Sequence, residues 1–199
     1  MVPMIYMLLF VSVAAPVSGL AAFGMDDYAV YSAVLAITPI TDTHASQRLL
    51  IAQETLDSRE LPSPLKICPQ LSPDLQQLIK DLLTSNQDER GLPELLEKGK
   101  FRIERPWVMI NPGQADLWRR RRFQPQVPVD PPDREIADPF PEPNLIQLSR
   151  VLFNADRTSA LVYVSRSCGS LCGSSSWRVL GKKNGAWNIL PSPVCGMIN

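Results

Sequence analysis

The clearest strand pattern in the chain lies between residues 145 and 190, where apolar runs are separated by turn-favouring residues. The first run, 145–153, ends at a cluster, 154–157, whose side chains favour turns by bonding to their own backbone. The second run, 159–167, has apolar side chains on both of its faces near the middle. Such a run indicates a central strand that is covered on both sides.

A third strand is predicted over 175–182, after a glycine-containing segment, 168–173, in which the chain can reverse in few residues. Asn184-Gly185 then marks a two-residue hairpin, because a type I′ turn requires positive φ at both central positions. A turn of this length places Trp187 opposite Lys182. The whole stretch is therefore predicted to be a β-meander.

Four groups of residues in this meander form a recognisable pattern: Leu148-Ser149-Arg150-Val151 with Phe153-Asn154, Ala160-Leu161-Val162-Tyr163-Val164, Cys168-Gly169 with Leu171-Cys172-Gly173, and Lys182-Lys183-Asn184-Gly185 with Trp187. Together they resemble an uncharacterised family of secreted bacterial proteins. A weaker similarity lies upstream, at 28–35 and 49–55. The resemblance implies the meander and an exported location, and it implies no activity. Cys68 and Cys195 lie outside the pattern.

Two longer helices are predicted upstream of the meander. The first follows Asp26-Asp27, which can cap it, and carries apolar residues at helical spacing until Pro39 ends it. The second opens at Ser72-Pro73-Asp74, with serine at the cap, proline at the first helical position and an acid in the first turn. Its apolar stripe consists of Leu75, Leu78, Ile79, Leu82 and Leu83.

Shorter elements are predicted elsewhere: a strand over 48–54, a loop over 61–69, a helix over 93–98, an edge strand over 101–110 that is broken by Pro106, and a helix over 116–122. Together these elements predict a single α+β domain over 23–199. We expect N-terminal helices packed on a mainly antiparallel β-sheet, flat or curved, with a C-terminal β-meander.

Residues 1–22 form a near-continuous apolar run without lysine or arginine. Small residues near its end, such as Gly19 and Ala21, are typical of a secretory signal peptide and its cleavage point. An uncleaved membrane anchor is the alternative, because the run is just long enough to span a bilayer. We therefore expect a secreted or periplasmic protein that keeps no stable membrane span after cleavage.

Lysine plus arginine equals aspartate plus glutamate, at 20 residues each, so the formal net charge is zero. Such a chain has no overall field that would attract nucleic acid, and no nucleic-acid partner is expected. Proline is the outlier, at 19 of 199 residues, and it is concentrated in 124–143. Proline lacks the backbone N–H that a sheet requires, so this segment is predicted to be a surface excursion of the domain.

Familiar catalytic motifs are missing from the sequence. His44 is the only histidine, so any Ser-His-Asp or Cys-His arrangement would have to use it, and a histidine-based zinc site is excluded. There is no P-loop, no G-x-G-x-x-G motif and no nucleophile elbow. The sequence thus assigns no catalytic residue, cofactor or metal, although a hydrolase with a carboxylate-only site is a third functional alternative.

Three groups of residues suit ligand binding, and each has a simpler interpretation. The arginines from Arg119 to Arg122 suit phosphates or acidic polymers, but cations also favour the C-terminal end of a helix. Aromatic residues of the meander either line a pocket or belong to the core: Tyr163, Trp177 and Trp187. Acidic residues of the proline-rich segment suggest calcium but fit a solvated linker better: Asp130, Asp133, Glu135 and Asp138.

Four cysteines in an exported chain predict two disulfides, although three pairings are possible. The spacing of Cys168 and Cys172 suits a bridge across the mouth of the hairpin, which leaves Cys68 with Cys195. A four-thiolate zinc site is an alternative that an oxidising compartment disfavours. A redox pair is another, disfavoured because no helix is expected to begin there and activate a thiol.

The function expected from the sequence is that of an exported, non-catalytic binding or structural domain of the cell envelope or extracellular space. Its partner is expected to be an unknown protein or envelope component. The main alternative is an exported thiol–disulfide protein that uses Cys168 and Cys172.

Overall fold

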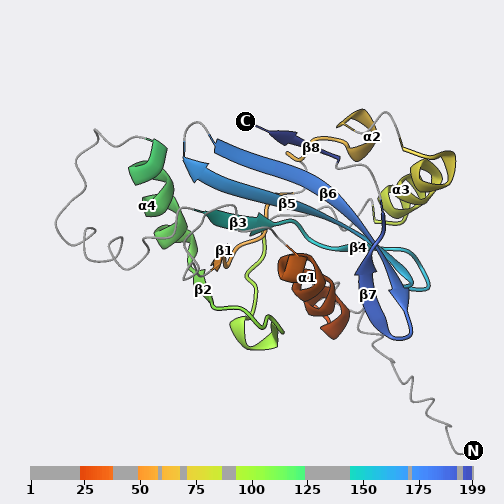
Figure 1. Ribbon diagram of the computed structural model, residues 1–199, viewed down its shortest axis with the longest axis horizontal. Coiled ribbons are helices and arrows are strands. Elements are labelled where there is room, and N and C mark those ends of the chain that lie inside the picture. The colour runs from red at the N-terminus through yellow and green to blue at the C-terminus, as the bar shows by residue number, and fades with distance from the viewer. Residues whose placement is uncertain are drawn as a thin grey trace, which may run out of the picture.

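The computed structural model describes residues 23–37, 49–57, 60–67, 71–86, 93–123, 144–169, 172–191 and 195–198. Within these ranges the chain forms an α+β fold, with helices packed against both faces of one sheet (Figure 1). The predicted fold class is therefore confirmed. No helix in the described ranges is long and apolar enough to cross a membrane.

The helices of the described ranges are α1 (Met25–Ile37), α2 (Pro64–Ile67), α3 (Pro73–Ser85) and α4 (Pro112–Phe123), with one 3-10 turn, η1 (Lys98–Lys100). The strands are β1 (Leu49–Ala52), β2 (Trp107–Ile110), β3 (Leu145–Leu148), β4 (Leu152–Phe153), β5 (Ser159–Gly169), β6 (Cys172–Lys183), β7 (Ala186–Ile189) and β8 (Cys195–Ile198).

The sheet has the strand order β2-β1-β3-β5-β6-β7, with β4 paired to β5 and β8 paired to β6. β1 runs parallel to β2 and β3, whereas the pairings of β5 and β6 in the described ranges are antiparallel. β5 occupies one edge of β6, so β7 and β8 share the other edge. β7 pairs with residues 180–183 and β8 with residues 174–177, which leaves Arg178 and Val179 between the two paired stretches.

The meander forms as predicted. β5 lies between β3 and β6, and Trp187 lies opposite Lys182. Asn184 and Gly185 have φ values of 51° and 79°, which is the positive range that the turn requires.

The predicted strand 145–153 is instead two strands, β3 and β4. Ser149 interrupts it, because its Oγ accepts the hydrogen bond from the Tyr163 N–H at 2.9 Å where a main-chain carbonyl would otherwise stand.

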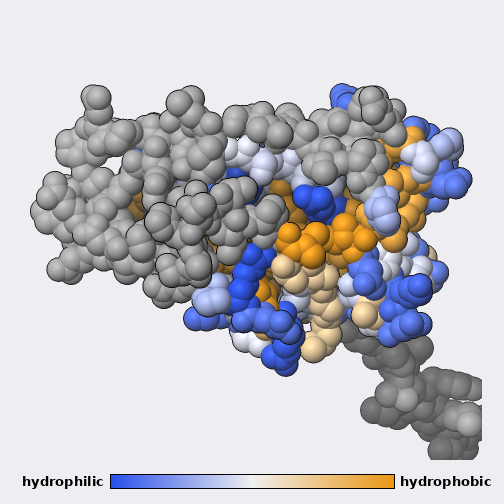
Figure 2. Space-filling model, viewed as in Figure 1, coloured by the Kyte–Doolittle hydropathy of each residue, from blue (hydrophilic) through white to orange (hydrophobic). Residues whose placement is uncertain are grey.

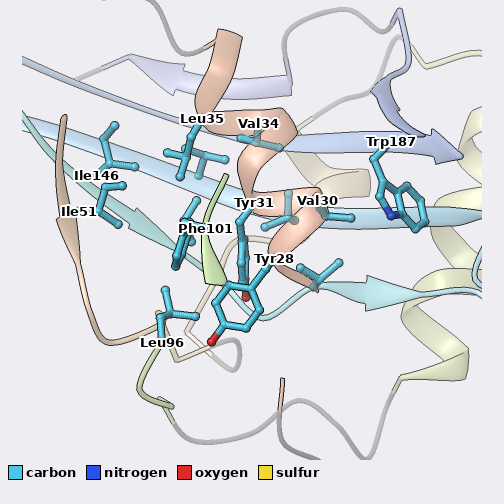
Figure 3. Packing of buried hydrophobic residues seen from close by; sticks show 14 of the residues in the cluster. Tyr28, Val30, Tyr31, Val34, Leu35, Ile51, Leu96, Phe101, Ile146 and Trp187 are labelled. Carbon is cyan, nitrogen blue, oxygen red and sulfur yellow. The ribbon is translucent and has the colours of Figure 1, made fainter. Parts of the chain in front are cut away.

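Because side chains alternate along β5, they enter two cores on opposite faces of the sheet. On one face α1 covers Val162 and Val164, together with a group of aromatic and aliphatic residues from several elements (Figure 3). On the other face α3 covers Leu161 and Tyr163. A third, smaller cluster lies under α4, around Trp118. The edge of the sheet at β2 is thereby covered as well.

Helix α1 is fixed by its own side chains. The Tyr31 hydroxyl donates to the Ser149 carbonyl at 3.0 Å, and the Tyr28 hydroxyl accepts from the Glu97 N–H at 2.8 Å. Both rings pack edge to face with each other and contact Phe101 (Figure 3). The helix thus satisfies backbone groups of two irregular segments, around Glu97 and Ser149.

The predicted helix over 93–98 is wrong. Leu95 forms an isolated bridge with Glu54, and the Leu96 N–H donates to the Gln53 carbonyl at 2.7 Å. These hydrogen bonds to a distant part of the same chain hold the segment extended as far as the turn at η1. Leu96 is buried in the core, whereas Leu95 is exposed, and the backbone of the segment pairs with the residues that follow β1.

Three shorter predictions need new boundaries. The edge strand begins only at Trp107, after Pro106. The loop predicted over 61–69 contains the short helix α2. Helix α4 begins at Pro112, four residues earlier than predicted, because the Asn111 side chain accepts from the Gln114 N–H at 2.9 Å and caps it.

Two neighbouring aspartates at the start of α1 have opposite electrostatic environments. Lys182 donates to Asp26 at 2.8 Å, and this hydrogen bond is the main reason that the pKa of Asp26 is lowered. Asp27 accepts from the Gly24 N–H at 2.9 Å, but burial of its carboxyl raises its pKa. The first carboxylate therefore stabilises the fold when it is ionised, and the second costs free energy when it is ionised.

Asp26→Asn and Asp27→Asn should therefore respond to pH in opposite directions. The stability that wild type holds over Asp26→Asn should be complete at neutral pH and shrink as the pH falls through the lowered pKa, below about 4. The free energy of unfolding of wild type, relative to that of Asp27→Asn, should instead rise as the pH falls, because protonation of Asp27 removes the cost of burying its charge. Urea unfolding of the three proteins between neutral pH and acid measures this, and parallel pH profiles for the two variants would contradict it.

Candidate functional site

The face of β5 and β6 that carries α1 changes from apolar to polar along its length. The register pairs Ala160 with Leu180 near the β6–β7 turn, and both side chains are fully buried. Further along the same face each opposed pair contains at least one polar side chain: Val162 with Arg178, Val164 with Ser176, and Arg166 with Ser174. Polar side chains therefore gather at one end of a surface that is otherwise core.

A pocket of about 80 Å³ lies over this polar end. Val34 and Ile37, at the end of α1, form one wall, while the sheet supplies the rest: Arg166, Ser174, Ser176 and Arg178 among them. The two arginines lie four residues apart along the strands, which corresponds to roughly 13 Å between their backbones. The pocket lies between them, so long guanidinium side chains reach it from both ends.

A second, larger and more open pocket of about 600 Å³ adjoins the first and shares Ile37 and Arg178 with it. Its apolar walls come from Ala33 and Ala36 on α1 and from the stretch of β7 that contains Trp187. We call the two pockets together the α1 groove. Figure 2 shows hydrophobic surface over α1 and hydrophilic residues beside it over β5 and β6.

Arg178 is the least satisfied charged group of the groove. Its side chain is half-buried, and that burial lowers the pKa of its guanidinium. Within the described part of the chain it makes no hydrogen bond or ion pair, whereas Arg166 donates from Nε to the Asn144 amide oxygen at 2.9 Å. Arg178 has therefore lost hydration without gaining a partner among these residues.

The chemistry of the groove suits binding. Its described lining offers two guanidinium groups and the hydroxyls of Ser174 and Ser176, but no carboxylate, imidazole or thiol. Guanidinium and hydroxyl groups donate hydrogen bonds to oxyanions and do not act as general bases at neutral pH. The lining thus supplies donors and positive charge without a group for proton transfer.

The opposite flank of α1 also carries arginines, but one of them has a structural task. A pocket of about 450 Å³ there is lined by Ser32, Arg102 and Arg105, together with Glu104. Arg105 donates to the Leu35 carbonyl near the end of α1, and the Ser32 hydroxyl accepts from the Arg102 N–H at 2.9 Å. Those contacts hold the helix in place, and Glu104 offsets positive charge.

The structure describes the backbones, but not the side chains, of Cys168, Cys172 and Cys195, and Cys68 lies outside the described ranges. Cys168 ends one strand of the β5–β6 hairpin and Cys172 begins the other. Cys195 begins β8, which lies beside α2, the helix that ends one residue before Cys68. Both predicted disulfides, Cys168–Cys172 and Cys68–Cys195, stay predictions.

The aromatic residues singled out from the sequence do not line one pocket. Tyr163 and Trp177 pack edge to face in the α3 core, with ring centroids 5.1 Å apart. Trp187 lies on the opposite face and borders the α1 groove. The alternation of side chains along the strands separates them.

The remaining predicted sites fall on α4 or outside the described residues. Arg119 and Arg120 lie on α4, where Arg120 pairs with Asp116 at 2.8 Å across one helical turn. Such an exposed pair fits the structural interpretation of this cluster. His44 and the acidic cluster of the proline-rich segment lie outside the described ranges: Asp130, Asp133, Glu135 and Asp138. Within those ranges no group of three His, Cys, Asp or Glu side chains could hold a metal ion.

Sequence reasoning missed Arg166 and Arg178. The available signal was the alternation in β6, where Ser174, Ser176 and Arg178 share a face with Leu180. A polar run on the face that should be buried is unusual and marks a position where another requirement competes with stability. Only the register shows that Arg166 belongs to the same face.

Comparison of the chain with models of protein families, with curated proteins and with solved structures finds no match. The assignment of a site therefore depends on the geometry of this chain alone.

Two buried arginines should differ in what they contribute to stability. Arg150 pairs with Glu94 at 2.8 Å and lies over the Phe23 ring, so Arg150→Met should lower the free energy of unfolding by roughly 3 kcal/mol. Arg178→Met should leave stability unchanged or raise it, because it removes a desolvated charge and keeps the aliphatic packing. Chemical denaturation without added ligand measures both, and an equal loss in the two variants would show that Arg178 has a structural task.

Proposed function

We propose that this chain is an exported, non-catalytic binding domain of the cell envelope or extracellular space, and that the α1 groove is its ligand site. The observation that carries the proposal is the polar end of the sheet face beneath α1. A fold selected only for stability would fill this face with apolar side chains, as it does at Ala160 and Leu180. Arg178 and its neighbours depart from that rule beside an open groove.

Export is supported by residues 1–22, an apolar run that ends in small residues typical of a signal-peptide cleavage point. Phe23, the first described residue after the apolar run 1–22, is buried against Tyr28 and Tyr31, with ring centroids 6.1 and 6.2 Å away. A cleavage point before Phe23 would leave these ring contacts in place. The resemblance to secreted bacterial proteins agrees with this proposal.

The thiol–disulfide alternative has less support. Cys168 and Cys172 lie on two strands, and no helix of the described ranges begins at either residue. A helix N-terminus is what commonly activates the thiol of a redox pair. We therefore propose that the pair is a structural bridge at the end of the hairpin.

The binding proposal is tested by native mass spectrometry of the full chain, expressed with its N-terminal segment and recovered from the exported fraction. Wild type should carry a bound small molecule. Ile37→Trp should lose it, because Ile37 is exposed and borders both pockets of the groove.

Met25→Trp is the matched control, because Met25 is also an exposed apolar residue and lies at the other end of α1. This variant should retain the bound molecule. Wild type without any bound molecule, or equal retention by Ile37→Trp, would contradict the proposal.

A further inference from the structure

We infer that the ligand of the α1 groove is an anionic amphiphile, with a carboxylate or phosphoryl head between Arg166 and Arg178 and an apolar body between α1 and β7. This inference rests on the proposed function and adds the chemical class of the ligand. It follows from the division of the groove into one small polar pocket and one larger apolar one.

The charge of the small pocket selects an anion. Two guanidinium groups border it, and no acidic side chain in the described lining neutralises them. The C-terminal end of α1 also lies there and contributes about half a negative charge. That partial charge is smaller than the full positive charge of Arg178 alone, so an anion is still favoured.

The donor arrangement suits oxygen atoms. A guanidinium can donate two parallel hydrogen bonds to a carboxylate or a phosphoryl group, and Arg178 has no partner for them among the described residues. Ser174 and Ser176 place hydroxyl donors between the arginines. An oxyanion bound here would restore the hydrogen bonds that Arg178 loses when the sheet and α1 desolvate it.

The sizes of the two pockets assign the head and the body. A volume of about 80 Å³ holds a head group and little more, since a water molecule occupies roughly 30 Å³. The adjoining volume of about 600 Å³ lies within the range of typical small-ligand sites, and its walls include Ile37, Trp187 and Ile189. Because both pockets share Arg178 and Ile37, one molecule can occupy them together.

Isothermal titration of the full chain with defined probes tests the inference. Decanoate and decyl phosphate carry the two oxyanion heads on the same apolar body, decanol carries no charge, and inorganic phosphate carries no body. At least one anionic amphiphile should bind, and the dissociation constants of decanol and of inorganic phosphate should each be higher by about tenfold or more. The stronger of the two anionic probes identifies the head group as carboxylate or phosphoryl.

Variants of Arg178 test the assigned contact. Arg178→Gln should lower the affinity for the anionic probe by about tenfold or more. Arg178→Lys should lower this affinity less, because lysine keeps the charge and loses only the paired donors. Arg120→Gln is the control, since Arg120 pairs with Asp116 on α4, and it should bind as wild type does.

The inference is wrong if neither anionic probe binds, if decanol binds as tightly as they do, or if Arg178→Gln binds unchanged. These results are distinct from failure of the proposed function. A neutral molecule that co-purifies with wild type and is lost from Ile37→Trp would preserve the binding role and overturn the anionic ligand.

Discussion

The packing of α1 on the β5–β6 hairpin is the contact on which the rest of the structure depends. Tyr31 is fully buried and its hydroxyl reaches the Ser149 carbonyl, at the break between β3 and β4. Tyr28 and Ser32 accept hydrogen bonds from the backbone of the irregular segment that leads to β2. Loss of a buried aromatic side chain typically costs about 3–5 kcal/mol, so the position of α1 is strongly determined.

The groove follows from a difference in length. A helix of 13 residues is about 20 Å long, whereas β5, with 11 residues, extends for roughly 36 Å. The helix cannot cover the whole face of the hairpin at any crossing angle. The apolar pairs lie beneath it, and the polar pairs with Arg166 and Arg178 lie at its end. The side chains of β6 that face α1 are thus apolar where the helix covers them and polar where the helix ends.

The same hairpin connects stability to the proposed function. Near the β6–β7 turn, Lys182 bonds to Asp26 and lies over Trp187, which fastens the start of α1. At the other end of α1, Arg105 bonds to the Leu35 carbonyl. The helix is therefore fixed at both ends, so the wall of the groove that α1 supplies is held in place. A rigid, preformed site loses little conformational entropy when a ligand binds.

Local signals in the sequence were sufficient for much of the fold. Asn184-Gly185 determined the register of β7, and Ser72-Pro73 located the start of α3, since turns and caps depend on neighbouring residues. The helix predicted over 93–98 did not form, because hydrogen bonds to residues 53–55, which are distant in sequence, decided the conformation of this segment.

The sequence did not predict the site, for the same reason that it did not predict the structure of residues 93–98. Arg166 and Arg178 become neighbours of α1 only through strand pairing and the placement of the helix, which no local pattern contains. The sequence singled out the cysteine motif, whereas the unusual chemistry of the structure lies at Arg178, two residues beyond the last serine of β6.

A crystal structure of the protein with bound decyl phosphate tests the central claim most directly. The account predicts phosphoryl oxygens within hydrogen-bonding distance of the Arg178 guanidinium and an alkyl chain that runs past Ile37 toward Trp187. A probe bound instead on the other flank of α1, beside Arg102 and Arg105, or along the arginines of α4, would contradict the account.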